Sequence, residues 1–315
     1  MIKKKEKGVS LRSFALVFVI IAIVVVMSFA SPVFLTSKNI INIIRQISIN
    51  GIIAVGMTFV ILTGGIDLSV GSVVAITSVI CGYSLEKGMY WLTACILAIA
   101  IALIFGAFNG VMVAYVGFQP FIATLATVTM GSGIALAFSD GKPFIIKNEA
   151  FLNIGQGYVG AIPIPIILLV VVVASGLIIL KTTTFGRYVF AIGGNKNAAK
   201  LSGVRTRRVE LMVYVISSLC AAIVGLILSA RISSGQPTAG EGYELDAIAA
   251  TAIGGTSMSG GVGSLTGTIF GFVILGLVTN SMNLLNINSF YQQIVKGILI
   301  ILAVFLDMTS KGKKE

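Results

Sequence analysis

Few side chains inside the apolar runs of this sequence can ionise, and their types limit the chemistry available to the chain. They are Asp67, Glu210 and Lys296, and each lies at or near the end of a run, from which Lys296 can extend its amine to a membrane surface. The sequence contains no histidine, which removes imidazole metal ligands, histidine-activated nucleophiles and the commonest general base. We therefore predict no catalytic site, no metal site and no cofactor, which argues against an enzyme.

Groups that could capture energy are also missing from the sequence. Neither Gly-Lys pair, at Gly141 or at Gly312, is followed by the serine or threonine of a nucleotide-binding GxxxxGK[ST] loop. The three cysteines (Cys81, Cys95 and Cys220) are scattered through apolar sequence without metal-ligand spacing. Coupling to protons or sodium usually leaves ionisable residues in the middle of a membrane. This disfavours a secondary transporter or channel that works alone.

Glycine and polar residues interrupt the apolar sequence at GGIDLSVGS. Gly64 and Gly65 end one run, and Asp67 comes just before the next. Two interpretations stay open. Asp67 is the N-cap that accepts the free N–H groups of the next helix, or the break borders a polar path, because irregular backbone is tolerated in a membrane where it lines a cavity. A similar stretch, GGTSMSGGVGS, comes later, so we expect one broken or short helix near 61–72 and another near 246–264.

A few further polar side chains lie within the runs. Thr124 and Thr127 are three residues apart and therefore share one helix face. The same spacing joins Asn280 and Asn283, and Asn109 is a further polar residue. Such groups either hydrogen-bond between helices or line a pore. Together with these five residues, the candidates for a broken helix and a polar path are Gly64, Gly65, Asp67 and Ser69.

The composition is that of a chain whose natural solvent is a bilayer. Hydrophobic residues make up 57% of the 315 residues and charged residues only 10%, with a mean hydropathy of +1.03. Soluble domains carry about 25% charged residues, so this chain cannot cover itself with a polar surface. We predict an all-α polytopic membrane protein with about ten spans, near 13–31, 46–63, 67–84, 90–115, 120–138, 163–180, 209–230, 246–258, 265–285 and 289–306.

The net charge of +11 is concentrated in a few segments between the apolar runs. Without interleaved aromatic residues this pattern argues against a nucleic-acid partner. The segments 1–12, 181–208 and 306–315 hold 15 of the 22 lysines and arginines, and such residues favour the cytoplasmic side. We therefore expect both termini in the cytoplasm, with tails 1–12 and 307–315 flanking one transmembrane domain, 13–306.

The basic segment KTTTFGRYVFAIGGNKNAAKLSGVRTRR carries seven cations and no acid. Within it, NKNAAKLSGV predicts a short amphipathic helix that ends at Gly203, with Leu201 and Val204 on one face and Lys200 and Arg207 outside it. Cations of this kind anchor a loop to anionic lipid. A structured helix in the loop favours a second interpretation, in which it docks onto a partner protein.

Four long stretches resemble one known family. They are INGIIAVGMTFVILTGGIDLSVGSVVAITSVI (49–80), FNGVMVAYVGFQPFIATLATVTM (108–130), FGRYVFAIGGNKNAAKLSGV (185–204) and AIGGTSMSGGVGSLTGTIFGFVILG (252–276). They are similar to the ribose-type sugar permeases of bacterial ABC importers, and the outer GYVGAIPIPIIL (157–168) is also typical. The resemblance runs from about residue 40 to the C-terminus. Branched-chain amino-acid and nucleoside permeases share the broader fold, but GGIDLSVGS favours the sugar branch.

The resemblance implies a permease subunit in the cell membrane, usually paired with a second copy. Its partners would be two ATPase subunits and an extracytoplasmic sugar-binding protein. NAAKLSGV is similar to the family's Glu-Ala-Ala-x-x-x-Gly coupling motif at Ala198, Ala199 and Gly203, whereas Asn197 replaces the glutamate and the Ile-x-Leu-Pro continuation is missing. The implied ATPase-coupling residues are Arg187, Asn197, Ala198, Ala199, Lys200, Leu201 and Gly203. The sugar itself, whether pentose, hexose, inositol or a sugar-like signal, is not specified.

Overall fold

The structure is a computed structural model that describes residues 6–312, so the predicted tails 1–12 and 307–315 lie partly outside it. The described chain is almost entirely helical. Its α-helices are α1 (Glu6–Ala30), α2 (Ser37–Leu62), α3 (Val70–Glu86), α4 (Trp91–Val111), α5 (Pro120–Ser139), α6 (Glu149–Gln156), α7 (Ile164–Thr182), α8 (Thr184–Gly194), α9 (Lys196–Leu201), α10 (Thr206–Ile232), α11 (Tyr243–Ile253), α12 (Leu265–Leu284) and α13 (Ser289–Gly312). A π-helical turn, η1 (Met112–Val116), extends α4.

Each predicted apolar run corresponds to a helix. Six helices are long and apolar enough to cross a membrane, namely α2, α4 with η1, α5, α7, α10 and α12. Three shorter apolar helices lie at Phe14–Ala30, Val70–Glu86 and Ser289–Leu302. α11 has only 11 residues, too few to cross a bilayer, for which a helix needs roughly 20. The described residues form a polytopic α-helical membrane protein, and the short helices expected beside the two glycine breaks are present.

Two features of the structure differ most from the sequence analysis. α2 begins at Ser37, well before the predicted span, and Arg45 lies inside it. The charge did not end the helix because its guanidinium reaches Gln156, whose carbonyl oxygen accepts from Nη2 at 3.0 Å. The guanidinium also lies 5.0 Å from the ring centroid of Tyr158. The second difference is α8, an additional helix in the basic segment that was expected to be a loop apart from one short helix.

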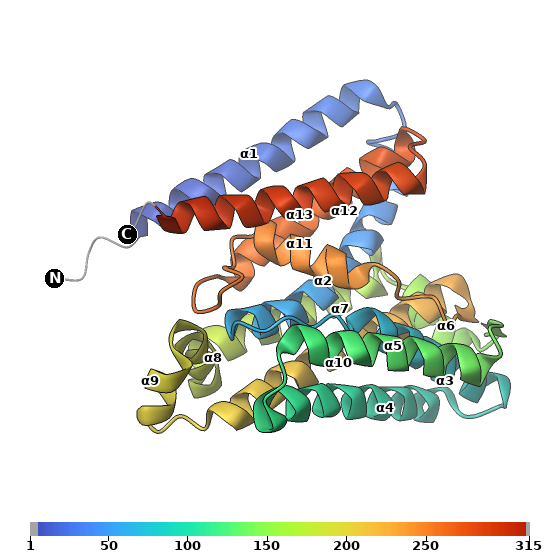
Figure 1. Ribbon diagram of the computed structural model, residues 1–315. Coiled ribbons are helices and arrows are strands. Elements are labelled where there is room, and N and C mark those ends of the chain that lie inside the picture. The colour runs from blue at the N-terminus through green and yellow to red at the C-terminus, as the bar shows by residue number, and fades with distance from the viewer. Residues whose placement is uncertain (1–5, 313–315) are drawn as a thin grey trace.

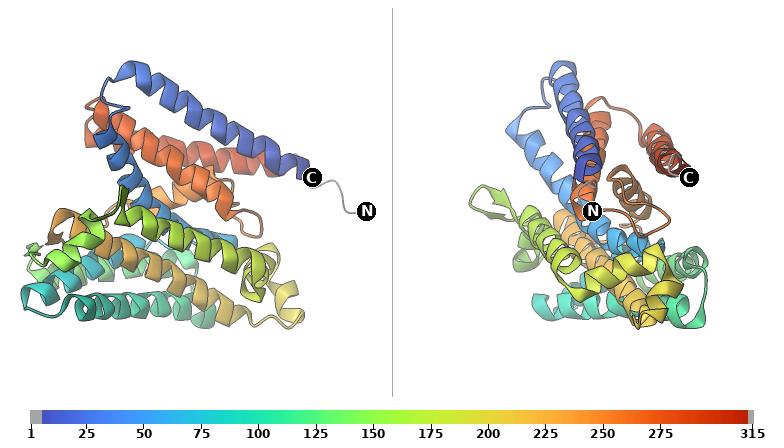
Figure 2. Two further views of the ribbon diagram at one scale, coloured as in Figure 1. Left: turned by 180° about the vertical axis from the view of Figure 1, so that it is seen from behind. Right: turned by 90° about the vertical axis from the view of Figure 1, so that its left-hand side faces the viewer.

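α2 is the central helix of the fold. It is buried without interruption over 48–62 and packs against α7, α10, α11 and α12. α3, α4 and α5 lie on one side of it, and α1, α12 and α13 lie on the other (Figure 1, Figure 2). α10 packs closely on α4 because Gly106 and Gly110 carry no side chain; an added Cβ would lie 2.7 Å from Ser218 Cβ and 2.8 Å from Leu211 Cα, respectively. Small residues four positions apart let two helices approach closely in this way.

The two ends of the bundle differ in structure. The start of α1, the end of α13 and the pair α8–α9 lie at one end (Figure 1). The opposite end carries α6 and four two-residue strands, β1 (Phe144–Ile145), β2 (Tyr158–Val159), β3 (Ile162–Pro163) and β4 (Ser234–Gly235). β1 pairs antiparallel with β4, with Phe144 opposite Gly235, and β2 pairs antiparallel with β3, with Tyr158 opposite Pro163. The described parts of the three segments predicted to share one side of the membrane are therefore grouped in space (Figure 1).

Candidate functional site

The break after α2 consists of residues 63–69, where the chain leaves helical geometry at Gly64. The φ angle of Gly64 is +83°, which only glycine adopts at little cost. α3 has Ser69 as its N-cap residue, and that side chain makes no capping hydrogen bond. Asp67 lies two residues earlier, and its Oδ1 accepts from the backbone N–H of Ser69 at 3.0 Å. The carboxylate thus stabilises the turn that leads into α3 and does not occupy the N-cap position.

A buried chain of hydrogen bonds joins this turn to α4 and α5. The Ser69 hydroxyl donates to Asp67 Oδ1 at 2.6 Å and accepts from Asn109 Nδ2 at 2.8 Å. In α5, Thr127 donates to Asn109 Oδ1 at 2.6 Å. All four side chains are fully buried. The structure therefore brings four of the predicted polar residues together as a network that holds three segments in place, and none of the four faces open space.

The remaining predicted polar residues lie in different surroundings. Thr124 is buried and donates to a carbonyl oxygen of its own helix at 2.9 Å. Asn280 in α12 and Asn39 in α2 exchange two amide hydrogen bonds, of 2.9 and 3.2 Å. Asn283 is exposed and accepts from Gln292 at 2.9 Å. Asn280 and Asn283 therefore join helices away from the first break. The amide partner Asn39 was not singled out in the sequence because its position next to Lys38 resembles an ordinary loop.

The predicted short helix of the basic segment is α9. Asn195 caps it, because its Oδ1 accepts from the backbone N–H of Ala198 at 2.9 Å. The helix ends in a turn in which Gly203 has a φ of +83°. Val204 N–H donates to the carbonyl oxygen of Ala199 in the same turn, at 3.1 Å. The end of the helix near Gly203 was predicted from the sequence, whereas the N-cap role of Asn195 was not singled out; both residues perform their usual capping roles.

The faces of α9 differ from the expected pattern. Leu201 and Val204 were predicted to share a face, but Val204 is half-buried whereas Leu201 is 90% exposed. Ala199 is the residue of α9 that faces the protein. Exposed cations surround this end of the molecule, namely Lys181, Arg187, Lys200, Arg205, Arg207 and Arg208. α9 therefore presents one large apolar side chain within a cationic surface.

The end of α8 contacts two non-helical segments, the first break (63–69) and the second break between α11 and α12 (254–264), and there backbone packs directly on backbone. Gly193, near the end of α8, lies against the carbonyl oxygen of Leu62 and the backbone nitrogen of Gly261, and an added Cβ would overlap both. Gly261 N–H donates to that same Leu62 oxygen at 2.9 Å. Gly260 lies against Gly64, where an added Cβ would be 2.7 Å from the Gly64 nitrogen. We call this contact the glycine junction; it comprises Gly64, Gly193, Gly260 and Gly261.

The two other ionisable residues of the apolar runs form ion pairs. Glu210 in α10 is buried, and its Oε1 lies 2.6 Å from Lys196 Nζ, which fixes α9 to α10. Lys296 was expected to extend to the membrane surface. Instead its Nζ lies 2.9 Å from Oδ2 of Asp246 in α11, whose side chain is 7% exposed. The sequence analysis missed Asp246, which is the first residue of the short eighth run, and nothing local in the sequence indicates its partner.

Comparisons with known proteins agree on one family. The family model described as the branched-chain amino acid transport system / permease component matches residues 39–304. The ribose import permease protein RbsC of Bacillus subtilis is 46% identical over 287 residues, which cover 90% of this chain and 89% of that protein. RbsC of Haemophilus influenzae is 46% identical over 309 residues, with 96% and 94% covered. The xylose transport system permease protein XylH of Escherichia coli K12 is 34% identical over 376 residues, with 98% and 94% covered.

No solved structure matches this chain. The family match nevertheless extends over both breaks, the buried network, the glycine junction and α9. The relatives are transport permeases and not enzymes. The chain therefore belongs to the membrane permease family that the branched-chain amino acid transport permease model describes, with ribose import permeases among its relatives.

Proposed function

We propose that this chain is the permease subunit of an ATP-binding-cassette importer that moves a monosaccharide, ribose or a related pentose, into a bacterial cell. The observation that carries the proposal is the 46% identity to ribose import permeases over at least 90% of the chain. The 34% identity to a xylose permease supports pentoses as the wider substrate class. Because the sequence contains no nucleotide-binding loop, the energy comes from separate ATPase subunits.

The proposed arrangement has about ten membrane segments within residues 13–306 and both termini in the cytoplasm. It is supported by the grouping of α8, α9, the start of α1 and the end of α13 at one end (Figure 1), because cationic segments favour the cytoplasmic side. A second copy of the permease lies beside the first in the bilayer. An extracytoplasmic sugar-binding protein docks at the opposite end, which carries α6 and the four short strands.

The ATPase subunits dock on α9 and its surroundings in this proposal. The proposed coupling residues are Arg187, Asn197, Ala198, Ala199, Lys200, Leu201 and Gly203. Six of them are exposed and form the docking surface, whereas Ala199 is buried and holds α9 against the protein. The support for this docking is the exposed Leu201 within a cationic surface, since an apolar anchor ringed by polar groups is typical of a protein interface. Movement of α9 is passed through α8 to the glycine junction, which contacts both breaks. Alternating access then results from displacement of the helices that begin or end there, α2, α3, α11 and α12.

Transport in liposomes tests the proposal directly. Purified permease is reconstituted with its ATPase and binding protein, and uptake of labelled D-ribose is measured with and without ATP. We expect uptake only when all three proteins and ATP are present. If the permease alone concentrates ribose against its gradient, the proposal is wrong, because the chain would then have its own means of coupling.

Replacement of Leu201 by serine tests the docking surface. Because this side chain is 90% exposed, the change should leave the unfolding temperature of the permease unaltered. The change should weaken binding of the ATPase subunits about tenfold, because a tenfold loss corresponds to roughly 1.4 kcal/mol, a typical contribution of an apolar anchor at an interface. Co-purification and surface plasmon resonance measure this. Ser202→Ala, in the next position, is the matched control and should bind normally; equal binding by Leu201→Ser would place the docking surface elsewhere.

Replacement of Asp67 by alanine tests whether the first break is structural or forms part of the sugar path. The change leaves the N–H and hydroxyl of Ser69 without their buried acceptor, so we expect a loss of about 1–3 kcal/mol of stability. The preference for ribose over xylose should not change. Thr129→Ala is the control, because the exposed Thr129 hydroxyl bonds only to its own helix, at Leu125. Altered preference with unchanged thermal unfolding would assign Asp67 to the path instead.

A further inference from the structure

A non-helical segment, 235–242, runs beside α3 for most of its length. At one end an added Cβ on Gly82 would lie 2.9 Å from Gly235 Cα, and at the other an added Cβ on Gly71 would lie 2.5 Å from the carbonyl oxygen of Gly240. Gly82 and Gly71 are separated by roughly 16 Å along the axis of α3. Backbone without helical hydrogen bonds is tolerated at membrane depth only when it is buried in protein or lines water. Gly235, Pro237 and Gly240 of the segment are buried against the protein, whereas Thr238 and Glu241 are exposed, so one side of the segment faces open space.

A cavity of about 110 Å³ lies between this segment, α3 and α5. Since one water molecule needs roughly 10–15 Å³ of such space, the cavity admits a small polar molecule of several heavy atoms. Its polar lining residues are Ser72 in α3, Ser132 in α5, Thr238 and Glu241 in the segment, and Glu244 in the first turn of α11. The apolar residues Ala75, Val128, Leu136 and Pro237 also line it.

The charge of the cavity selects the kind of ligand. Its lining residues, all within the described chain, include Glu241 and Glu244 and contain no lysine or arginine. The carboxylate of Glu244 lies over Gly71, where an added Cβ would overlap its Oε2, so the glycine leaves room for an acceptor at this position. An anionic ligand would meet two carboxylates of like charge and no cation among these lining residues. A neutral molecule with many hydroxyl donors, by contrast, complements carboxylate and hydroxyl acceptors.

We propose that this cavity binds the hydroxyl groups of a monosaccharide as it passes through the permease, with Glu241, Glu244, Ser72 and Ser132 as hydrogen-bonding partners. The inference rests on the proposed function, which supplies the sugar. The cavity is also tied to the moving parts, because the Ser72 hydroxyl donates to the carbonyl oxygen of Ser69 at 2.9 Å. Displacement of the first break would therefore displace one wall of the cavity and change its affinity for the sugar.

Thiol labelling of Ser132→Cys tests the site in the full assembly with ATPase and binding protein in liposomes. The native cysteines are free and buried, so a membrane-impermeant cationic thiosulfonate should label the introduced thiol selectively. We expect labelling, and we expect D-ribose under ATP turnover to slow it at least fivefold. Asp140→Cys, at the exposed end of the same helix, should be labelled at a rate that ribose does not change.

A second substitution tests the carboxylate. Glu244→Gln, added to Ser132→Cys, should raise about tenfold the ribose concentration that halves the labelling rate, whereas Asp140→Asn added to Ser132→Cys should not.

Three results would overturn this assignment. They are absence of labelling at the introduced thiol, labelling that ribose does not slow, and protection by sodium chloride but not by ribose, which would make the cavity a cation site. Uptake of labelled ribose by the unmodified assembly in the same vesicles separates the two proposals. If ATP-driven uptake is present but ribose gives no protection, the cavity assignment alone fails. If uptake is absent, the proposed function fails.

Discussion

Lys296→Ala is expected to lower the free energy of unfolding by about 3 kcal/mol, the largest effect on stability that we predict for a single side chain. Removal of one partner of a buried ion pair typically costs about 3–5 kcal/mol, because the other charge stays buried without compensation. Here Asp246 keeps a side chain that is 7% exposed, and Lys296 itself is 27% exposed, so we expect the lower end of that range. The pair also ties α13 to α11. Denaturant titration of the purified protein in detergent measures the loss.

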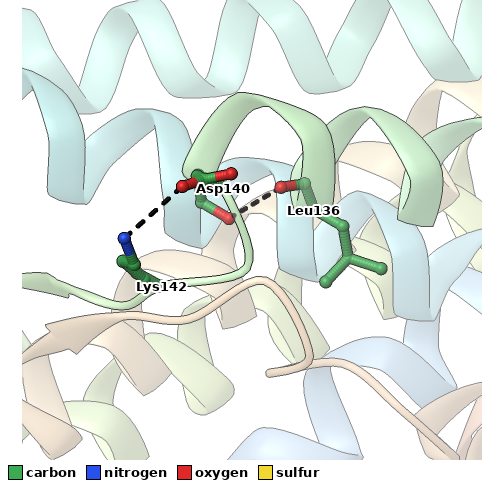
Figure 3. A network of polar contacts seen from close by, with 4 residues as sticks. Leu136, Asp140 and Lys142 are labelled. Atoms are coloured by element: carbon green, nitrogen blue, oxygen red, sulfur yellow. Dashed lines mark hydrogen bonds and ion pairs between the residues drawn. The ribbon is translucent and has the colours of Figure 1, made fainter.

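The chain contains a matched control of the same chemistry. Lys142 Nζ lies 3.4 Å from Asp140 Oδ2 at the end of α5, with side chains that are 79% and 90% exposed (Figure 3). Exposed pairs contribute roughly 0–1 kcal/mol, so Lys142→Ala should be nearly neutral. Replacement of both Lys296 and Asp246 by leucine should recover most of the stability, because no uncompensated charge remains. Equal losses in the two alanine variants would show that burial does not control the strength of these pairs.

Gly193→Ala is expected to abolish ATP-driven ribose uptake, with a loss of about 1–3 kcal/mol of stability from overpacking. The new Cβ would overlap the carbonyl oxygen of Leu62 and the nitrogen of Gly261. Neither is the end of a flexible side chain, so the backbone of at least one segment has to move. We expect ATP hydrolysis by the assembled complex to continue without transport, because the ATPase still docks on α9 while the glycine junction no longer holds both breaks.

The neighbouring glycine supplies the control for this prediction. An added Cβ on Gly194 would meet nothing within 4 Å, although this residue belongs to the same helix end and is exposed. Gly194→Ala should therefore retain uptake and change stability by no more than about 0.5 kcal/mol. Both activities are measured in the same liposomes. Normal ribose uptake by Gly193→Ala would contradict a role for the glycine junction in coupling.

The sequence by itself determined that the natural solvent of this protein is a bilayer, where its long apolar helices lie, and which family it belongs to. A charged fraction of 10% and long apolar runs leave few alternatives to a helical membrane protein, because each spanning helix satisfies its own backbone hydrogen bonds. The breaks at Gly64 and near Gly255, both with positive φ, were also predictable, since glycine permits that geometry locally. The end of α9 followed from Gly203 for the same local reason. Hydropathy, helix propensity and sequence motifs are properties of residues that are neighbours in the chain, so they can be predicted from one sequence alone.

Only the tertiary structure decided which residues meet. Asn109, Thr127 and Asp67 looked like separate polar residues, yet they form one buried network with Ser69. α2 continues through Arg45 because the guanidinium donates a hydrogen bond to the backbone carbonyl oxygen of Gln156 and lies over the ring of Tyr158. The glycine junction and the cavity beside α3 each combine segments that are far apart in sequence. Such contacts depend on how whole helices pack, and many partners satisfy the same local pattern, so hydropathy and spacing could not choose among them.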